Sequence, residues 1–220
     1  MICANCHLQI TPIVVPEART QECPECGRLE QYQTFPLFFI TGASGVGKTA
    51  ILPDLRRLLP DWDVFESDTL FWSPVKEVMW ACWFSIAHSL SLSGRPVIIS
   101  GTVLPHWFED LDQRRFFDPV HYLNLHCGDP TRDARLRARP EWRGITEDSV
   151  ERMREFAKWL LDHSETHFDP PMEMVDTSDE SVSDSAARVS DWARKNWSVW
   201  KEEHPEAVPS VTVLRDGSAE

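Results

Sequence analysis

The stretch that decides the fold is Gly42-Ala43-Ser44-Gly45-Val46-Gly47-Lys48-Thr49, which the apolar run at residues 35–41 precedes. It follows the pattern G-x-x-x-x-G-K-[S/T], set between a predicted buried strand and a predicted helix. Its glycines allow the main chain to curl so that successive N–H groups surround phosphate oxygens. The positive end of the following helix adds to the same field. The sequence therefore predicts a nucleoside triphosphate site.

Two side chains of this loop carry the expected chemistry. Lys48 is placed to reach the β- and γ-phosphates, and the Thr49 hydroxyl is placed to complete a Mg²⁺ shell. Glycine-rich turns also occur without a ligand, but here every position of the motif matches and the strand–loop–helix setting is intact. This context favours phosphate binding.

The charge balance of the chain argues against a nucleic-acid-binding protein. The 220 residues carry a formal net charge of −13, whereas a protein that grips a phosphate backbone draws its affinity from Lys and Arg. No apolar run approaches the roughly 20 residues that a membrane span requires, and the first residues lack the pattern of a signal segment. We therefore expect a cytoplasmic protein with no membrane partner, and nucleic acid is not the expected ligand.

Four of the six cysteines form a pattern typical of a zinc site. Cys3 and Cys6 make one Cys-x-x-Cys pair, and Cys23 and Cys26 make a second pair that Gly27 follows. Each pair predicts a tight knuckle whose two thiolates face one metal. Residues 1–34 are too few to bury a core of their own, so Zn²⁺ would supply much of the folding free energy of a small ribbon.

Other interpretations of the cysteines stay open at this point. His7 could replace one thiolate as a ligand, and a Cys-x-x-Cys pair could serve redox chemistry, although no thioredoxin-like context surrounds it. The ribbon region contains only Arg19 and Arg28 against four glutamates, which favours a structural or protein-contact role over RNA binding. Cys82 and Cys127 lie in apolar segments and are predicted to be ordinary buried thiols.

From residue 35 the pattern alternates between strands and helices, which predicts a mostly parallel sheet covered on both faces. Strands are expected at residues 35–41, 63–66, 96–101, 121–127 and 173–176. Helices are expected at residues 48–59 and 75–92, from residue 129, at about 150–161, and after residue 180. Thr177 and Glu180 have capping-box spacing before the last helix. Residues 211–214 could add an edge strand, and residues 215–220 are expected to be disordered.

An acidic residue closes the strand that follows the phosphate loop. From this position Asp68 can face the γ-phosphate and accept a proton from an attacking hydroxyl, or hold a magnesium-bound water. Glu66 is the second choice for the base. The structural alternative for Asp68 is a helix N-cap.

Arginines cluster on the predicted helix after residue 129 and on the turn beyond it. The cluster consists of Arg132, Arg135, Arg137, Arg139 and Arg143. Arg135 and Arg139 are four residues apart and would share a helix face. Planar guanidinium groups suit a transferring phosphoryl group, whose charge spreads over several oxygens. The alternative is a solvated helix paired with Asp133 and Glu141, but the position after a core strand favours a mobile lid over the phosphates.

Together these segments resemble the small P-loop kinases, the nucleoside- and nucleotide-kinase-like group that also includes shikimate, gluconate and chloramphenicol phosphotransferases. The resemblance rests on residues 42–49, 67–68, 94–105, 126–129, 135–143 and 175–178, and it covers about residues 35–197. It implies an α/β protein with the P-loop NTPase three-layer fold and a mostly parallel five-stranded sheet, preceded here by a small zinc ribbon. It also implies ATP and Mg²⁺ at the strand ends, an arginine lid, and adenine near Thr177 and Ser178.

The expected organisation has three parts, namely a zinc ribbon at 1–34, a kinase-like domain at 35–197 and a partly disordered extension at 198–220. The fused ribbon departs from the minimal family and leaves the substrate open. Acceptor-binding residues should lie between Asp68 and Pro105 or just beyond. This region offers few cations but several aromatic and polar side chains: Trp72, Trp80, Trp83, Thr102, His106 and Trp107. A nucleoside-like acceptor would stack on the tryptophans, although most of them could equally be core residues.

The residues and the resemblance together predict an ATP-dependent phosphotransferase acting on a hydroxyl of a small molecule, in the first place a nucleoside or nucleoside-like metabolite. Residues 42–49 would hold the phosphates and Mg²⁺, and Asp68 would serve as base or magnesium partner. Arg135 and Arg139, joined by Arg143, would stabilise the transferring group. Thr177 would lie near the adenine.

The rival hypothesis is an ATP-binding switch or adaptor whose zinc ribbon docks a protein or RNA partner. Kinase action on RNA ends or on a protein is a third hypothesis, and a homodimer stays open as well. Asp68 separates an enzyme from a switch, because only phosphoryl transfer requires a base at that position.

Overall fold

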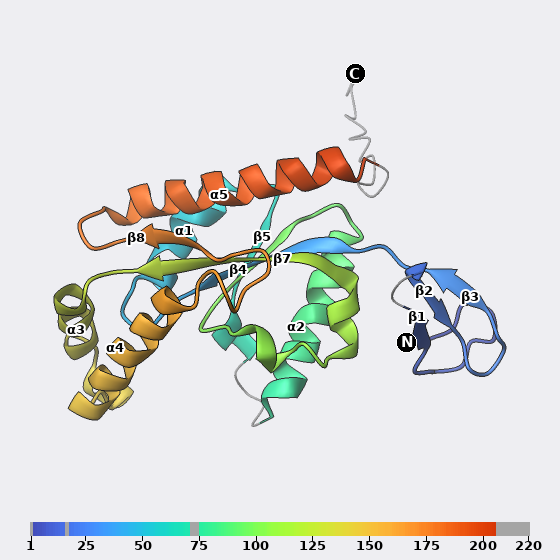
Figure 1. The fold of residues 1–220 in the computed structure, drawn as a ribbon, viewed down its shortest axis with the longest axis horizontal. Coiled ribbons are helices and arrows are strands. Elements are labelled where there is room, and N and C mark those ends of the chain that lie inside the picture. The colour runs from blue at the N-terminus through green and yellow to red at the C-terminus, as the bar shows by residue number, and fades with distance from the viewer. Residues whose placement is uncertain (1, 16–17, 71–74, 206–220) are drawn as a thin grey trace, which may run out of the picture.

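The protein is described by a computed structural model that covers residues 2–15, 18–70 and 75–205, and two sheets organise it (Figure 1). A small antiparallel sheet has the order β1-β2-β3, and a larger parallel sheet has the order β5-β6-β4-β7-β8. The predicted strand at 211–214, the predicted disorder at 215–220 and the acceptor candidate Trp72 lie outside the described residues.

The elements follow the sequence prediction closely. The strands are β1 (Ile13–Val15), β2 (Thr20–Glu22), β3 (Leu29–Gln31), β4 (Phe35–Thr41), β5 (Asp63–Glu66), β6 (Val97–Ser100), β7 (Phe117–His126) and β8 (Glu173–Asp176). The α-helices are α1 (Lys48–Leu58), α2 (Lys76–Ser91), α3 (Asp129–Arg137), α4 (Glu147–Asp162) and α5 (Val182–Glu203). Short 3₁₀ turns lie at Ser67–Leu70, Pro105–Trp107, Asp112–Phe116 and Glu141–Arg143. The predicted five-stranded parallel α/β sheet is confirmed.

The central strand β4 explains why the fold has three layers. All its residues are buried, and alternate side chains enter two separate cores. Phe35, Leu37 and Phe39 pack on the side of α2, whereas Phe38 and Ile40 pack on the side of α1 and α5. Since side chains alternate along a strand, a continuous apolar run of this kind requires cover on both faces. Figure 1 shows α5 and α2 on opposite sides of the sheet.

The last helix begins later than its predicted cap. Ser181 is the N-cap of α5, and its hydroxyl accepts a hydrogen bond from the Asp184 amide at 3.1 Å. The predicted capping box at Thr177 and Glu180 is therefore wrong. The physical reason is that the Thr177 hydroxyl donates instead to the Val46 and His126 carbonyl oxygens.

The small sheet belongs to the ribbon region and joins the larger domain through aromatic contacts. The Tyr32 ring meets the edge of Phe116 with centroids 5.6 Å apart. Phe116 in turn stacks on His88 of α2 with centroids 3.9 Å apart. These rings connect the end of the ribbon to the helix whose first turn lines the main cavity described below.

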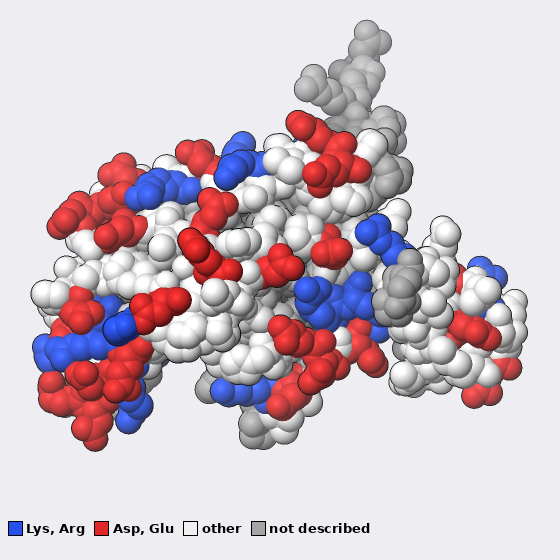
Figure 2. Space-filling view, viewed as in Figure 1, with Lys and Arg blue, Asp and Glu red and all other residues white. Residues whose placement is uncertain are grey.

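Charged side chains of both signs are spread over the surface (Figure 2). On the face drawn, acidic side chains gather over the end of the molecule that contains α3 and α4, where basic ones lie among them. Among the described residues, no helix combines the length and the apolar character needed to cross a membrane.

At the carboxyl ends of β5 and β6, Gly101 lies so close to Ser67 that there is no room for a side chain at position 101. A Cβ at this position would stand 2.0 Å from Ser67 Oγ and 2.9 Å from Ser67 Cβ. We expect Gly101→Ala to lower the free energy of unfolding by about 1–3 kcal/mol through overpacking, measured by urea denaturation. Gly128→Ala is the control, because its nearest new contacts, at 3.8 Å, are ordinary. Equal stability of both variants and the wild type would contradict this packing.

Candidate functional site

The phosphate loop passes from β4 into α1 through glycines whose φ angles are positive. Gly42, Gly45 and Gly47 have φ of 139°, 94° and 104°, a region that side chains disfavour. Gly42 also lies so close to β7 that a Cβ would stand 2.5 Å from the Leu125 carbonyl oxygen. The loop therefore requires glycine at each of these positions.

The main-chain amides of this loop are available to a ligand. Within the described part of the chain, the amides of Gly45 and Gly47 donate no hydrogen bond. Successive free N–H groups at the start of a helix form an anion-binding concavity. The geometry fits the triphosphate site that the motif predicts.

Lys48 lies on the same loop with its ammonium group turned back to the main chain. Its Nζ donates to the carbonyl oxygens of Gly42 at 2.6 Å and Ala43 at 3.0 Å. Burial, followed by the nearby Arg139 charge, lowers the pKa of Lys48 to about 8, while Asp68 and Glu66 oppose that shift. A bound anion would favour the charged form of this lysine.

Two carboxylates stand opposite the loop at the end of β5. Thr49 Oγ1 donates to Glu66 Oε1 at 2.5 Å, so the hydroxyl expected to bind Mg²⁺ lies beside a carboxylate. Oxygen ligands of this kind fit a hard cation such as Mg²⁺. Asp68 is exposed in the 3₁₀ turn after β5, where Ser67 Oγ donates to it at 3.4 Å, and it lines the same cavity. The two carboxylates thus differ in their surroundings, because Glu66 accepts a hydrogen bond from Thr49 and Asp68 accepts one from Ser67.

The arginine cluster divides into two groups. Arg135, Arg139 and Arg143 line the cavity. Arg132 is fully buried, and its guanidinium donates to the Cys127 carbonyl at 3.2 Å and to Asp129. Arg137 pairs with Glu147 of α4 at 2.7 Å. Only the first group can reach a ligand, and its members come from α3 and from the chain just beyond it.

Thr177 connects the loop to the arginines. Its hydroxyl, in a side chain that is only 4% exposed, donates to the Val46 carbonyl at 2.8 Å. Arg135 donates to the Thr177 carbonyl at 3.1 Å. Thr177 therefore contacts both the phosphate loop and Arg135.

One cavity of about 560 Å³ is lined by residues of the phosphate loop, by both carboxylates and by three of the arginines, namely Arg135, Arg139 and Arg143. Its far wall contains one lysine and two indole rings instead of arginines. It is formed by Lys76, Met79 and Trp80 of α2 and by Trp107. Thr102 also lines it, as expected. Sequence reasoning missed Lys76, although its spacing of four residues from Trp80 could have indicated a shared helix face.

The other acceptor candidates lie elsewhere. Trp83 is a core residue whose indole nitrogen donates to the Ser67 carbonyl at 3.1 Å. His106 is exposed and does not line this cavity. The expectation that most of these tryptophans are core residues is confirmed for Trp80 and Trp83, whereas Trp107 is half-buried at the cavity wall.

The four ribbon cysteines come together as two equivalent knuckles. His7 and Gly27 follow the second cysteine of each pair with φ of 58° and 68°. Their amides donate to the carbonyls of Cys3 and Cys23, both at 2.9 Å. His7 therefore occupies the turn position that Gly27 takes in the other knuckle, and it is not a member of the cysteine cluster.

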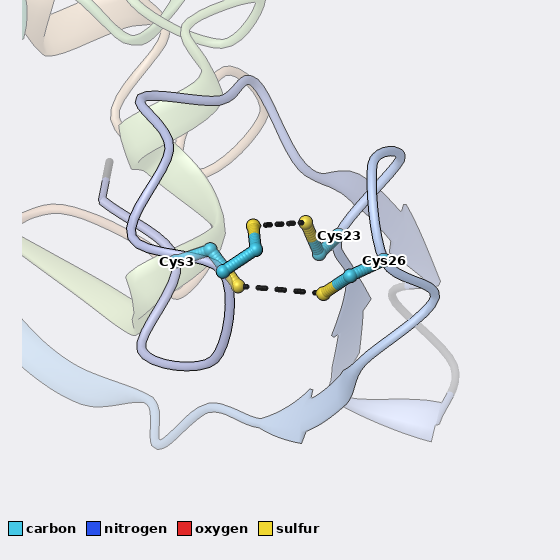
Figure 3. Close-up of side chains that lie close together, drawn as sticks. Cys3, Cys23 and Cys26 are labelled. Carbon is cyan, nitrogen blue, oxygen red and sulfur yellow. Dashed lines mark hydrogen bonds between the residues drawn. The ribbon is translucent and has the colours of Figure 1, made fainter.

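The sulfur positions fit a tetrahedral zinc ion. All four Sγ atoms lie within 4.8 Å of one another, and the Cys3–Cys26 and Cys6–Cys23 pairs are both 3.8 Å apart (Figure 3). Four thiolates at a Zn–S distance of about 2.3 Å would be about 3.8 Å apart. The Asn5 amide at 3.4 Å also lowers the pKa of Cys26, to about 6, which favours the thiolate. The predicted four-cysteine cluster is confirmed.

Similar folds occur among solved structures. A sugar kinase from Janibacter sp. HTCC2649 superposes with a TM-score of 0.53 at 15% identity, over 76% of this chain and 98% of that one. A protein of Chloroflexus aurantiacus j-10-fl, described as a candidate kinase, gives a TM-score of 0.55 at the same identity and coverage. No protein-family model and no curated protein matches the chain. The resemblance to P-loop kinases is confirmed at the level of the fold.

The lowered pKa of Lys48 gives a pH prediction. Above a pKa of about 8 the ammonium loses its proton, so ATP affinity is fully present below this value and declines above it. In the absence of metal, we expect the affinity to fall about tenfold between about pH 7 and about pH 9. Lys48→Arg keeps its charge over that range and should give a flat profile in calorimetric titrations. An equally flat wild-type profile would contradict the assigned role of Lys48.

The cysteine cluster gives a metal prediction. Purified wild-type protein should contain one Zn²⁺ per chain, and Cys26→Ser should lose most of it, because a structural site needs all its ligands. Cys82→Ser is the matched control, since Cys82 lies outside the cluster. Metal analysis after gentle purification provides the measurement. Substoichiometric zinc in the wild type, or full retention in Cys26→Ser, would rule out the four-cysteine site.

Proposed function

We propose that this chain is a phosphotransferase that moves the γ-phosphate of ATP to a hydroxyl of a small molecule. The observation that carries the proposal is the convergence of a phosphate loop, two carboxylates and three arginines on one cavity. Binding of a phosphate requires only the loop. Transfer requires in addition a base and positive charge around the migrating group, and this cavity contains both.

The nucleotide side of the cavity binds and orients the triphosphate. The loop amides and Lys48 hold its oxygens, and the Thr49 hydroxyl and Glu66 carboxylate would hold Mg²⁺. When bound, Mg²⁺ supplies positive charge that neutralises the phosphate oxygens. Thr177 acts as a positioning residue, because it contacts the Val46 carbonyl and the Arg135 guanidinium, and the adenine would lie near it.

Asp68 serves as the general base for the acceptor. In the transfer step the acceptor oxygen attacks the γ-phosphorus, the bond from that phosphorus to the β,γ-bridging oxygen breaks, and ADP leaves with the bond electrons. The acceptor hydroxyl gives its proton to the Asp68 carboxylate. Arg135, Arg139 and Arg143 stabilise the charge on the migrating group. Glu66 is assigned to the metal rather than to the base because it already contacts Thr49.

The aromatic wall supports a planar acceptor. Trp80 and Trp107 lie side by side in this cavity with ring centroids 6.4 Å apart. A nucleoside or nucleoside-like metabolite, the finer form of the proposal, would pack its base against the half-buried Trp107, which Trp80 supports from the core. The likeness to a sugar kinase adds no substrate information to this chain.

A second candidate function is supported by the ribbon surface. Ile13 and Leu29 are both more than half exposed, and both are in register with Glu22 across the small sheet. Two exposed apolar side chains on one face of the ribbon favour an ATP-dependent adaptor whose ribbon docks a partner protein. Such an adaptor would not depend on a base beside the γ-phosphate.

The Asp68→Asn variant tests the enzyme against the adaptor. We expect at least about a hundredfold loss of kcat with nearly unchanged ATP affinity, because the amide cannot accept the hydroxyl proton. Phosphoryl transfer is followed by mass spectrometry and ATP binding by calorimetry. Asp191→Asn on α5 is the control, since Asp191 is exposed and does not line the cavity. Wild-type turnover in Asp68→Asn would remove Asp68 from the role of base.

A further inference from the structure

A second cavity, of about 320 Å³, lies on the α2 side of the sheet and shares no lining residue with the cavity described above. Its walls come from the chain after β6, from the first half of β7 and from the segment before β8. This volume is at the lower end of the range typical of small-molecule sites. The cavity therefore has room for one small ligand.

The hydroxyl group of Tyr122 is exposed to this cavity and has no hydrogen-bond partner in the described part of the chain. The Tyr122 side chain is only 4% exposed, because its ring packs on Phe39 and Phe168. Its oxygen is not among the buried polar atoms that are sealed from solvent without a partner. A ligand in the cavity can therefore reach it. Buried hydroxyls are normally paired, so an unpaired one at a cavity indicates a polar ligand group.

Two opposite charges flank this hydroxyl without contacting each other. Burial raises the pKa of Tyr122, and the nearby charges then act on it in opposite directions, Arg114 lowering the pKa and Glu109 raising it. The hydroxyl therefore keeps its proton and can donate it to an anion.

Neither of these charged groups has a partner of opposite sign. The Arg114 guanidinium donates to the Phe117 carbonyl oxygen, which holds it at the start of β7. Among the described residues, no ion pair includes Arg114 or Glu109. Opposite charges that line one cavity and stay apart leave room for a ligand that contacts both.

The remaining walls add negative charge and apolar surface. Asp118 and Asp169 also line the cavity, so its described lining contains three carboxylates and one guanidinium. An excess of carboxylates favours an ammonium group on the ligand. Phe108 and Phe168 belong to the core and present apolar surface to the same cavity.

We propose that this second cavity binds a free α-amino acid with an apolar side chain. The carboxylate of the ligand pairs with Arg114 and accepts a hydrogen bond from the Tyr122 hydroxyl. Its ammonium group pairs with Glu109, and its side chain packs on the phenylalanines. A simple carboxylate would leave the acids of the cavity unused, and a simple amine would leave Arg114 unused. The proposal is independent of phosphoryl transfer, because the two cavities have no lining residue in common.

Sets of three matched probes test this site on the full-length, zinc-loaded chain. L-Leucine is compared with 3-methylbutylamine, which lacks only the carboxylate, and with 4-methylpentanoate, which lacks only the ammonium group. L-Phenylalanine, 2-phenylethylamine and 3-phenylpropanoate form the second set. In equilibrium dialysis we expect at least one amino acid to bind at least about tenfold more tightly than either of its partners, because each partner loses one charge-assisted contact. Saturating ATP should leave this binding in place.

Tyr122→Phe tests the hydroxyl alone, because the variant keeps the ring. It should weaken amino-acid binding about threefold to tenfold and leave amine binding unchanged. Its stability in urea denaturation should be nearly that of the wild type, since the hydroxyl has no partner within the described protein. Tyr32→Phe is the matched control, because Tyr32 is the other tyrosine of the chain and does not line the cavity.

Two charge variants assign the ends of the ligand. Arg114→Met should lower the affinity for the amino acid and the acid and leave the amine unchanged. Glu109→Gln should lower the affinity for the amino acid and the amine and leave the acid unchanged. Arg152→Met and Glu155→Gln on α4 are the controls, since both residues are exposed and lie outside the cavity.

Several results would overturn the amino-acid site. Equal binding of an amino acid and both of its partners would remove the zwitterion, and displacement by ATP would move the binding to the other cavity. A loss of affinity as large in Tyr32→Phe as in Tyr122→Phe would separate the binding from the hydroxyl. Absence of binding by both amino acids at about 10 mM would also overturn it.

Discussion

The constraint on which the rest of the site depends is the close approach of the phosphate loop to β7. With a Cβ at Gly42, the loop would collide with the Leu125 carbonyl oxygen. Because glycine removes this obstacle, β4 can turn into α1 directly over the ends of its neighbouring strands. The amides of the loop then face the same space as the carboxylates after β5 and the arginines after β7. The proposed phosphate binding and catalysis would therefore share one geometric origin.

The parallel sheet brings residues from other strand ends to the phosphate loop. In the order β5-β6-β4-β7-β8 the loop leaves the central strand, and its sequence neighbours approach from both sides. Ligands of open α/β sheets bind outside the carboxyl ends of the strands for this reason. Thr177, which follows β8, links the loop to Arg135 of α3, so this arginine is held against the loop. The far wall comes from α2, which is also the helix that contacts the ribbon through Phe116 and His88.

Much of this architecture can be predicted from the local sequence, whereas the positions of individual side chains in the site cannot. The five strands, the glycine loop and the cysteine pairs each have a short-range signal that the structure confirms. The sequence does not indicate which arginines reach the cavity, because the packing of α3 puts Arg132 in the core, whereas Arg139 lines the cavity from beyond the end of that helix. Lys76 shares a helix face with Trp80, but the sequence does not indicate its contact with Trp107, which belongs to another element.

The central claim is that the γ-phosphate of ATP passes to a small-molecule hydroxyl in this cavity. Its most direct test is incubation of the zinc-loaded chain with Mg²⁺, planar hydroxylated molecules and ATP whose γ-phosphoryl oxygens are a heavy isotope. The account predicts ADP together with an equal amount of an acceptor that has gained the labelled phosphoryl group. ADP accompanied only by labelled inorganic phosphate, or no ADP at all, would contradict it.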